Sequence, residues 1–160
     1  MDALFLTKPY DDRAKLVSTK GQRVKSTCEW IKEDKVYRSW LDSHSQLLWI
    51  SGGPGKGKTM LSIFLTEELA KVVEPLKDAK LVFYFCDYQD KERNTAITIL
   101  RGLLFQILQE RPKLFKCILP DFETEKKARY TISSLEALWR IFESMLRDLD
   151  FGTITVSLIV

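Results

Sequence analysis

Cysteine and histidine are scarce in this sequence, which has three residues of the first kind, Cys28, Cys86 and Cys117, and one of the second, His44. The cysteines are widely spaced and match neither a zinc-ligand pattern nor a paired disulfide framework. They predict reduced thiols in a cytosolic protein. His44 lies between two serines in a polar loop, which favours a solvated side chain over a general base. The sequence therefore offers no metal cluster and no obvious catalytic histidine.

Long apolar runs and an excess of one charge are also missing. No stretch reaches the roughly eighteen apolar residues that a membrane helix needs, and the start, Met1 to Thr7, is too short for a signal-peptide core. The 25 basic and 22 acidic residues are scattered and leave a net charge of +3, so neither nucleic acid nor a membrane is predicted as a partner. With 160 residues, 45% of them apolar, the chain reads as one cytoplasmic globular unit.

The order of predicted elements indicates an α/β fold with a mainly parallel sheet. Residues 1–46 precede the domain proper: a lead-in over 1–21 is expected outside the core with a short helix at most. A helix over 27–41 with one buried stripe follows, and Ser26 and Glu29 would cap it. Residues 47–160 form the domain proper. Its strands are predicted at 47–50, 81–86 and 153–160, its helices at 58–73, 95–110 and 135–149, and 113–131 gives no clear pattern.

A glycine-rich loop between the first strand and the next helix carries the chemistry. It fits the pattern of glycine, four residues, glycine, lysine, then serine or threonine. Such a loop turns backbone amides toward phosphate oxygens, and the following helix adds the positive end of its dipole. Lys58 is expected to reach the outer phosphates and Thr59 to bind Mg²⁺. We expect ATP or GTP with magnesium to bind the following residues: Gly52, Gly53, Pro54, Gly55, Lys56, Gly57, Lys58, Thr59 and Met60.

Other chemical candidates are weaker. Arg93 and Arg101 follow the second strand and could approach the phosphates, although surface ion pairs are the safer interpretation. The four tryptophans have apolar neighbours and are predicted to pack in the core. A hydrolase of this kind also needs an acidic residue at the end of another strand, and none follows 153–160, since Asp148 and Asp150 precede it. The sequence assigns no catalytic residue and does not support hydrolysis.

Several stretches together resemble the fungal NACHT-domain NTPases of the STAND class, NOD-like receptors related to the vegetative incompatibility proteins, with a nephrocystin-3-like N-terminal region. The resemblance spans nearly the whole chain. The matching stretches are Asp11-Asp12-Arg13, Thr19-Lys20-Gly21, Glu29-Trp30-Ile31, Leu47 through Leu61, Phe83-Tyr84-Phe85-Cys86 and Ala96 through Leu104.

This resemblance implies a three-layer P-loop NTPase fold that is incomplete, with about three strands and a short helical lead-in. In that family the strand matching 153–160 runs into an acidic Walker B motif, so the chain looks like a fragment that stops before it. The family uses ATP or GTP binding to control self-oligomerisation in signalling, and the segment near Lys20 and Gly21 resembles the one beside the base. A small-molecule or nucleotide kinase and a truncated, non-functional remnant remain alternatives.

Overall fold

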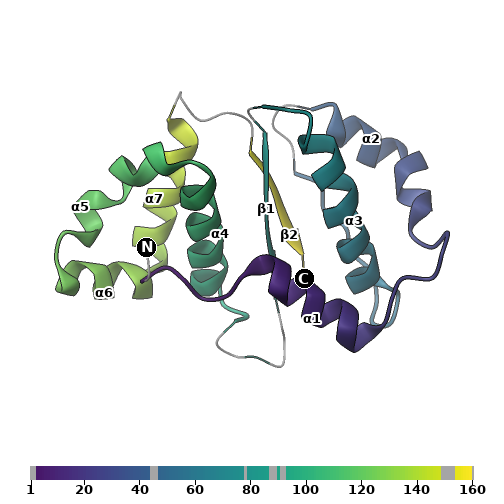
Figure 1. Ribbon diagram of the computed structural model, residues 1–160, viewed down its shortest axis with the longest axis horizontal. Helices are drawn as coiled ribbons and strands as arrows, with labels where there is room; N and C mark the ends of the chain where they lie inside the picture. The colour runs from purple at the N-terminus through teal and green to yellow at the C-terminus, as the bar shows by residue number, and fades with distance from the viewer. Residues whose placement is uncertain are drawn as a thin grey trace.

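The computed structural model describes residues 3–43, 47–77, 79–86, 90 and 93–148, and the backbone of 154–159 (Figure 1). Helices and 3-10 helices dominate these ranges. In chain order the elements are α1 (Pro9–Lys20), η1 (Glu29–Glu33), α2 (Lys35–Leu41), α3 (Lys58–Val73), β1 (Lys80–Phe85), α4 (Ala96–Glu110), η2 (Pro112–Cys117), α5 (Leu119–Phe122), α6 (Glu125–Ser133), α7 (Leu135–Arg147) and β2 (Ile154–Ile159).

Two parallel strands form the sheet, with Val82 of β1 opposite Val156 of β2. Successive side chains of a strand point to opposite faces, and β1 uses both. Phe83 and Phe85 pack with Ile63 of α3 and with partly buried side chains of α1. Val82 and Tyr84 join the larger cluster built by α4 and α7. The strands thus lie between α1 and α3 on one side and α4 and α7 on the other (Figure 1).

The predicted strand at 47–50 is not formed in the described part of the chain. These residues are assigned to no strand, and Leu47 and Trp49 are 88% and 80% exposed. An apolar run becomes a strand only where a neighbouring backbone bonds its amides and carbonyls. The described sheet contains β1 and β2 alone, and neither pairs with this segment. Of the three predicted strands, the two later ones are present in the described residues and the strand at 47–50 is not.

The predicted helix over 27–41 is divided into two shorter elements. Ser26 and Cys28 have φ of 71° and 67°, so the expected cap at Ser26 is absent and η1 begins at Glu29. Asp34 then adopts an extended conformation, and its carboxylate accepts hydrogen bonds from the amides of Val36 and Tyr37. Asp34 is a helix N-cap rather than a solvated position inside one long helix.

The lead-in is more extensive and better packed than predicted. Helix α1 spans Pro9–Lys20, and Leu4 before it is 1% exposed within the main cluster. Leu16 and Val17 of α1 pack against the cluster of Ile63, Phe83 and Phe85. The sequence shows no clear apolar periodicity here because only a few apolar side chains make the contact. The prediction that the lead-in stays outside the core was wrong.

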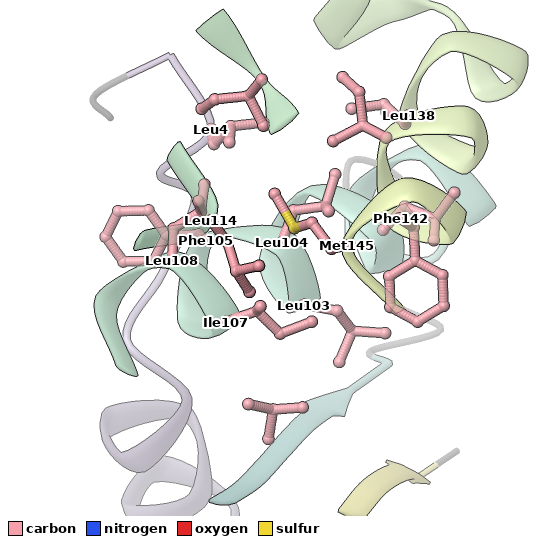
Figure 2. Packing of buried hydrophobic residues seen from close by; sticks show 14 of the residues in the cluster. Leu4, Leu103, Leu104, Phe105, Ile107, Leu108, Leu114, Leu138, Phe142 and Met145 are labelled. Atoms are coloured by element: carbon pink, nitrogen blue, oxygen red, sulfur yellow. The ribbon is translucent and has the colours of Figure 1, made fainter. Parts of the chain in front are cut away.

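The main core lies between α4 and α7. On α4, Leu100, Leu104, Ile107 and Leu108 are buried, and Ile97 is partly buried against them. Figure 2 shows side chains from both helices filling the space between them, with Leu104 and Met145 meeting there. Residues 113–131, which gave no clear pattern, lie mostly in η2, α5 and α6 and supply the buried Leu114 and Ile118.

Candidate nucleotide-binding site

The glycine-rich loop leads directly into α3, which begins at Lys58 as predicted. Gly57 is the N-cap residue of the helix and has φ of 77°, and Gly55 has φ of 72°. L-residues with a Cβ atom rarely adopt this left-handed conformation, whereas glycine does so without steric cost. Two of the glycines in the motif therefore meet a backbone requirement of the observed turn.

The loop is open to solvent over residues 51–57. A Cβ atom built on Gly53, Gly55 or Gly57 would meet no atom within 4 Å. No side chain caps the N-terminus of α3, and the first intrahelical bond runs from the amide of Leu61 to the carbonyl of Gly57 at 2.9 Å. A sixteen-residue helix thus presents an uncapped N-terminus beside an exposed loop, which favours an anion.

Lys58 connects the two ends of the loop. Its Nζ atom donates to the carbonyl oxygens of Gly52 at 2.6 Å and Gly53 at 3.0 Å. The ammonium group is therefore held against the loop backbone at a solvent-exposed position. Thr59 follows at the second helical position and is half-buried.

The body of α3 fixes this helix start in place. Leu61, Phe64 and Leu65 are buried against Ile31 and Tyr37 of the lead-in. Met60 packs partly buried against the cluster of Phe83 and Phe85. Of the nine predicted site residues, the structure thus brings Lys58 onto Gly52 and Gly53, places Thr59 and Met60 on the first turn, and leaves Pro54 and Lys56 exposed.

Neither candidate arginine is free to act as an anion ligand. Arg93 forms an ion pair with Asp12 of α1 at 2.6 Å, and the Arg101 guanidinium donates to the carbonyl of Ala3 at 2.8 Å. Burial disfavours the charged form of Arg93, but the Asp12 carboxylate outweighs burial and raises the pKa of this arginine. The sequence interpretation as structural ion pairing holds for Arg93, although the pair is largely buried rather than on the surface.

A pocket of about 310 Å³ adjoins the start of α3 and was not foreseen from the sequence. Its walls include Arg13 and Val17 of α1, Arg23 of the following segment, and Met60 and Glu67 of α3. Arg13 also donates to the Thr66 hydroxyl at 3.1 Å and contacts Glu67. Only the packing of α1 on α3 creates this pocket, and no sequence pattern reports such packing.

Thiols and metal-ligating side chains are further candidate functional groups within the described ranges. Cys28, Cys86 and Cys117 are free thiols, and burial raises the pKa of Cys86. No group of three histidine, cysteine or acidic side chains gathers there to hold a metal ion. None of the helices found there is both long and apolar enough to cross a bilayer. His44 and Asp150 lie outside the described residues.

A known protein family matches the part of the chain that contains this loop. The family described as Nephrocystin 3, N-terminal matches residues 26–159, which include η1, the loop, both strands and all helices after α1. The chain belongs to this family. The matched region includes all nine predicted site residues, from Gly52 to Met60.

A curated relative connects this nephrocystin 3 N-terminal family member to fungal proteins. The chain is 33% identical over 147 residues to the vegetative incompatibility protein HET-E-1 of Podospora anserina. The alignment covers 91% of this chain and 11% of that protein, so the chain spans about a tenth of the relative's length. No solved structure matches. The relationship to vegetative incompatibility proteins that the motifs indicated is thereby confirmed.

Proposed function

We propose that this chain binds Mg-ATP or Mg-GTP through Gly52–Thr59, as the nucleotide-binding part of an α/β P-loop domain. The observation that carries the proposal is the exposed loop at the uncapped start of α3, with the Lys58 ammonium held over the carbonyls of Gly52 and Gly53. A triphosphate gathers several negative oxygens in a small volume, and this arrangement supplies backbone donors, a helix dipole and a cation together.

Each residue of the loop has a separate task in this proposal. Gly55 and Gly57 hold the left-handed turn that faces amides inward. Lys58 would exchange its carbonyl partners for the outer phosphate oxygens, a stronger charge-assisted interaction. The Thr59 hydroxyl would ligate magnesium, which neutralises charge between the outer phosphates. The other residues bind and orient the nucleotide, and none is assigned a bond-breaking step.

We further propose that nucleotide binding acts as a switch in a signalling protein. The relative HET-E-1 is named a vegetative incompatibility protein, and this chain corresponds to about a tenth of it. We infer that the chain serves the same kind of response and that nucleotide binding controls self-association of the larger protein. The similarity to this relative favours a switch over a kinase.

Isothermal titration calorimetry of the 160-residue chain tests the binding proposal. Mg-ATP and Mg-GTP are titrated into wild-type protein, Lys58→Ala and Lys77→Ala, with AMP as the ligand lacking outer phosphates. Because a charge-assisted hydrogen bond contributes about 1.5–3 kcal/mol, Lys58→Ala should weaken triphosphate binding roughly 10- to 100-fold and AMP binding much less. Lys77→Ala is the control, since Lys77 is an exposed lysine that follows α3 and lies outside the loop.

The outcomes separate the proposals. No heat of binding with folded wild-type protein would overturn the nucleotide site and favour a remnant. An equal loss for triphosphate and AMP in Lys58→Ala would contradict the role given to the ammonium. Transfer of the terminal phosphate to a small-molecule acceptor would replace the switch by a kinase.

A further inference from the structure

An apolar groove of about 590 Å³ runs between α4 and α7, on the side of the sheet away from α3 (Figure 1). Ile99 and Leu103 of α4 form one wall, and Leu135, Trp139 and Phe142 of α7 form the other. Both helices are fully described and firmly packed on one another through the main core. The packing of α4 on α7 therefore determines the shape of the groove.

The wall formed by α7 continues as an apolar stripe along the helix. Leu135, Trp139, Phe142 and Leu146 recur every three or four residues, which places them on one side of the helix. Leu135, Trp139 and Leu146 are 41%, 51% and 47% exposed, and Phe142 between them is 8% exposed. The prediction that every tryptophan packs in the core was wrong here, because Trp139 is half exposed. One face of its ring contacts Phe142, with ring centroids 5.7 Å apart. Contiguous exposed apolar surface of this kind marks an interaction site.

The charges beside this stripe indicate what covers it. Glu136, Arg140, Glu143 and Arg147 also recur at helical spacing and alternate in sign. The alternation is antisymmetric about the midpoint of α7, between Ile141 and Phe142. If a second α7 runs in the opposite direction, Glu136 faces Arg147 of the partner subunit, and Arg140 faces Glu143 of the partner subunit. A two-fold axis generates all four contacts from two pairs.

We propose that a second copy of this chain docks on this face, with the two α7 helices antiparallel and Trp139 of each chain packed against the apolar face of the other. A partner of unrelated sequence would not require the charges of α7 to complement α7 itself. A large aromatic side chain beside a preformed apolar pocket is the typical anchor of such an interface. Two helices and a groove form a small interface, so we expect a dissociation constant in the range of about 1–100 µM.

The present ion pairs of these residues do not oppose this docking. Arg140 contacts Asp121 at 2.5 Å, and Arg147 approaches Glu143 at 3.9 Å, with arginine side chains 66% and 80% exposed. Exposed pairs of this kind contribute little to stability and rearrange at low cost. Burial of Trp139 and Leu135 against apolar neighbours supplies the larger favourable contribution, and the charges set the direction and register.

Charge exchange along α7 tests the proposal by analytical ultracentrifugation. Glu136→Arg and Arg147→Glu should each abolish dimerisation, because each places like charges opposite one another. An equimolar mixture of these two variants should form a heterodimer, and the double variant Glu136→Arg/Arg147→Glu should dimerise as the wild type does. The matched controls are Glu125→Arg and Arg129→Glu, an exposed pair on α6 that should leave the dissociation constant unchanged.

A second variant tests the apolar contact. Trp139→Ala should weaken dimerisation at least tenfold, whereas Tyr130→Ala, which removes a 69% exposed aromatic side chain from α6, should not. Circular dichroism confirms that each variant is folded. A wild-type chain that stays monomeric at about 1 mM, or single variants that fail to associate when mixed, would overturn the proposal. The groove and the nucleotide loop lie on different helices, so this result is independent of the titrations with Mg-ATP.

Discussion

At the scale of single residues, Gly102 of α4 is required by packing against Tyr84, although it belongs to no sequence motif. A Cβ atom on Gly102 would lie 2.6 Å and 2.8 Å from two ring carbons of Tyr84. The Tyr84 ring is 3% exposed, and its hydroxyl donates to the carbonyl of Arg93 at 3.1 Å. The ring is held at both ends, so it has no room to withdraw from a new methyl group.

Gly102→Ala should therefore destabilise the protein, although alanine ordinarily favours a helix interior by about 1 kcal/mol over glycine. Overpacking a closed core costs about 1–3 kcal/mol and exceeds that gain. We expect a net loss of up to about 2 kcal/mol in urea unfolding followed by circular dichroism. Gly53→Ala is the control, because a Cβ atom there meets nothing within 4 Å. A higher urea midpoint for Gly102→Ala would contradict the proposed contact.

The sequence identifies residues whose role is local and misses those whose role depends on distant neighbours. The turn at Gly55 and Gly57 follows from the motif, since the loop itself needs the left-handed conformation. The position of Gly102 under Tyr84 requires knowledge of how α4 crosses β1. The tryptophans show the same limit, because Trp49 and Trp139 have apolar sequence neighbours and are nevertheless exposed.

At the scale of elements, helices with strong local signals are predicted well. Helix α3 has the predicted limits, and α4 begins one residue later, after Thr95, whose hydroxyl accepts from the amide of Thr98. Helix α7 begins at Leu135 as predicted, after Ser134 as its cap. The segment 47–50 has no comparable local determinant, because a strand exists only through a partner that is distant in sequence. This difference explains why helices were recovered and one strand was not.

The contact between α4 and β1 depends on one buried amide side chain. Gln106 accepts from the amide of Phe83 at 3.1 Å and donates to the carbonyl of the same residue at 2.8 Å. It is 7% exposed and also donates to the carbonyl of Gly102 at 3.0 Å. A side chain of α4 thus takes the place of a neighbouring strand along this part of β1.

Gln106→Leu should cost roughly 2–5 kcal/mol of unfolding free energy, because it leaves the amide and carbonyl of Phe83 buried without partners. Gln109→Leu is the matched control, since Gln109 is exposed on the same helix. Hydrogen exchange measured by mass spectrometry should show faster exchange of peptides containing Phe83 in Gln106→Leu only. Equal stability of the two variants would argue against this contact as a major link.

At the scale of the whole molecule, α1 links parts that are distant in the sequence. Asp12 of α1 pairs with Arg93 before α4, and both side chains are at most 16% exposed. The neighbouring Arg13 bonds Thr66 and contacts Glu67 of α3. One turn of α1 therefore holds the helix that follows the glycine-rich loop and the segment that follows β1.

Asp12→Ala should destabilise the chain by about 2–3 kcal/mol, since it leaves the largely buried Arg93 cation without its partner. Asp11→Ala is the matched control, because both residues lie in the first turn of α1 and share its helix dipole, but Asp11 is exposed. We expect Asp11→Ala to lose no more than about 1 kcal/mol. Differential scanning calorimetry compares the two, and equal melting temperatures would show that the Asp12 pair contributes little.

The bonds from Gln106 to Phe83 also determine how this protein can aggregate. Each backbone amide makes one such bond, so a foreign strand arriving along β1 finds the Phe83 donor already occupied. Edge-to-edge pairing at Phe83 would first have to displace the Gln106 side chain. Loss of Gln106 would leave the amide and carbonyl of Phe83 available for such pairing.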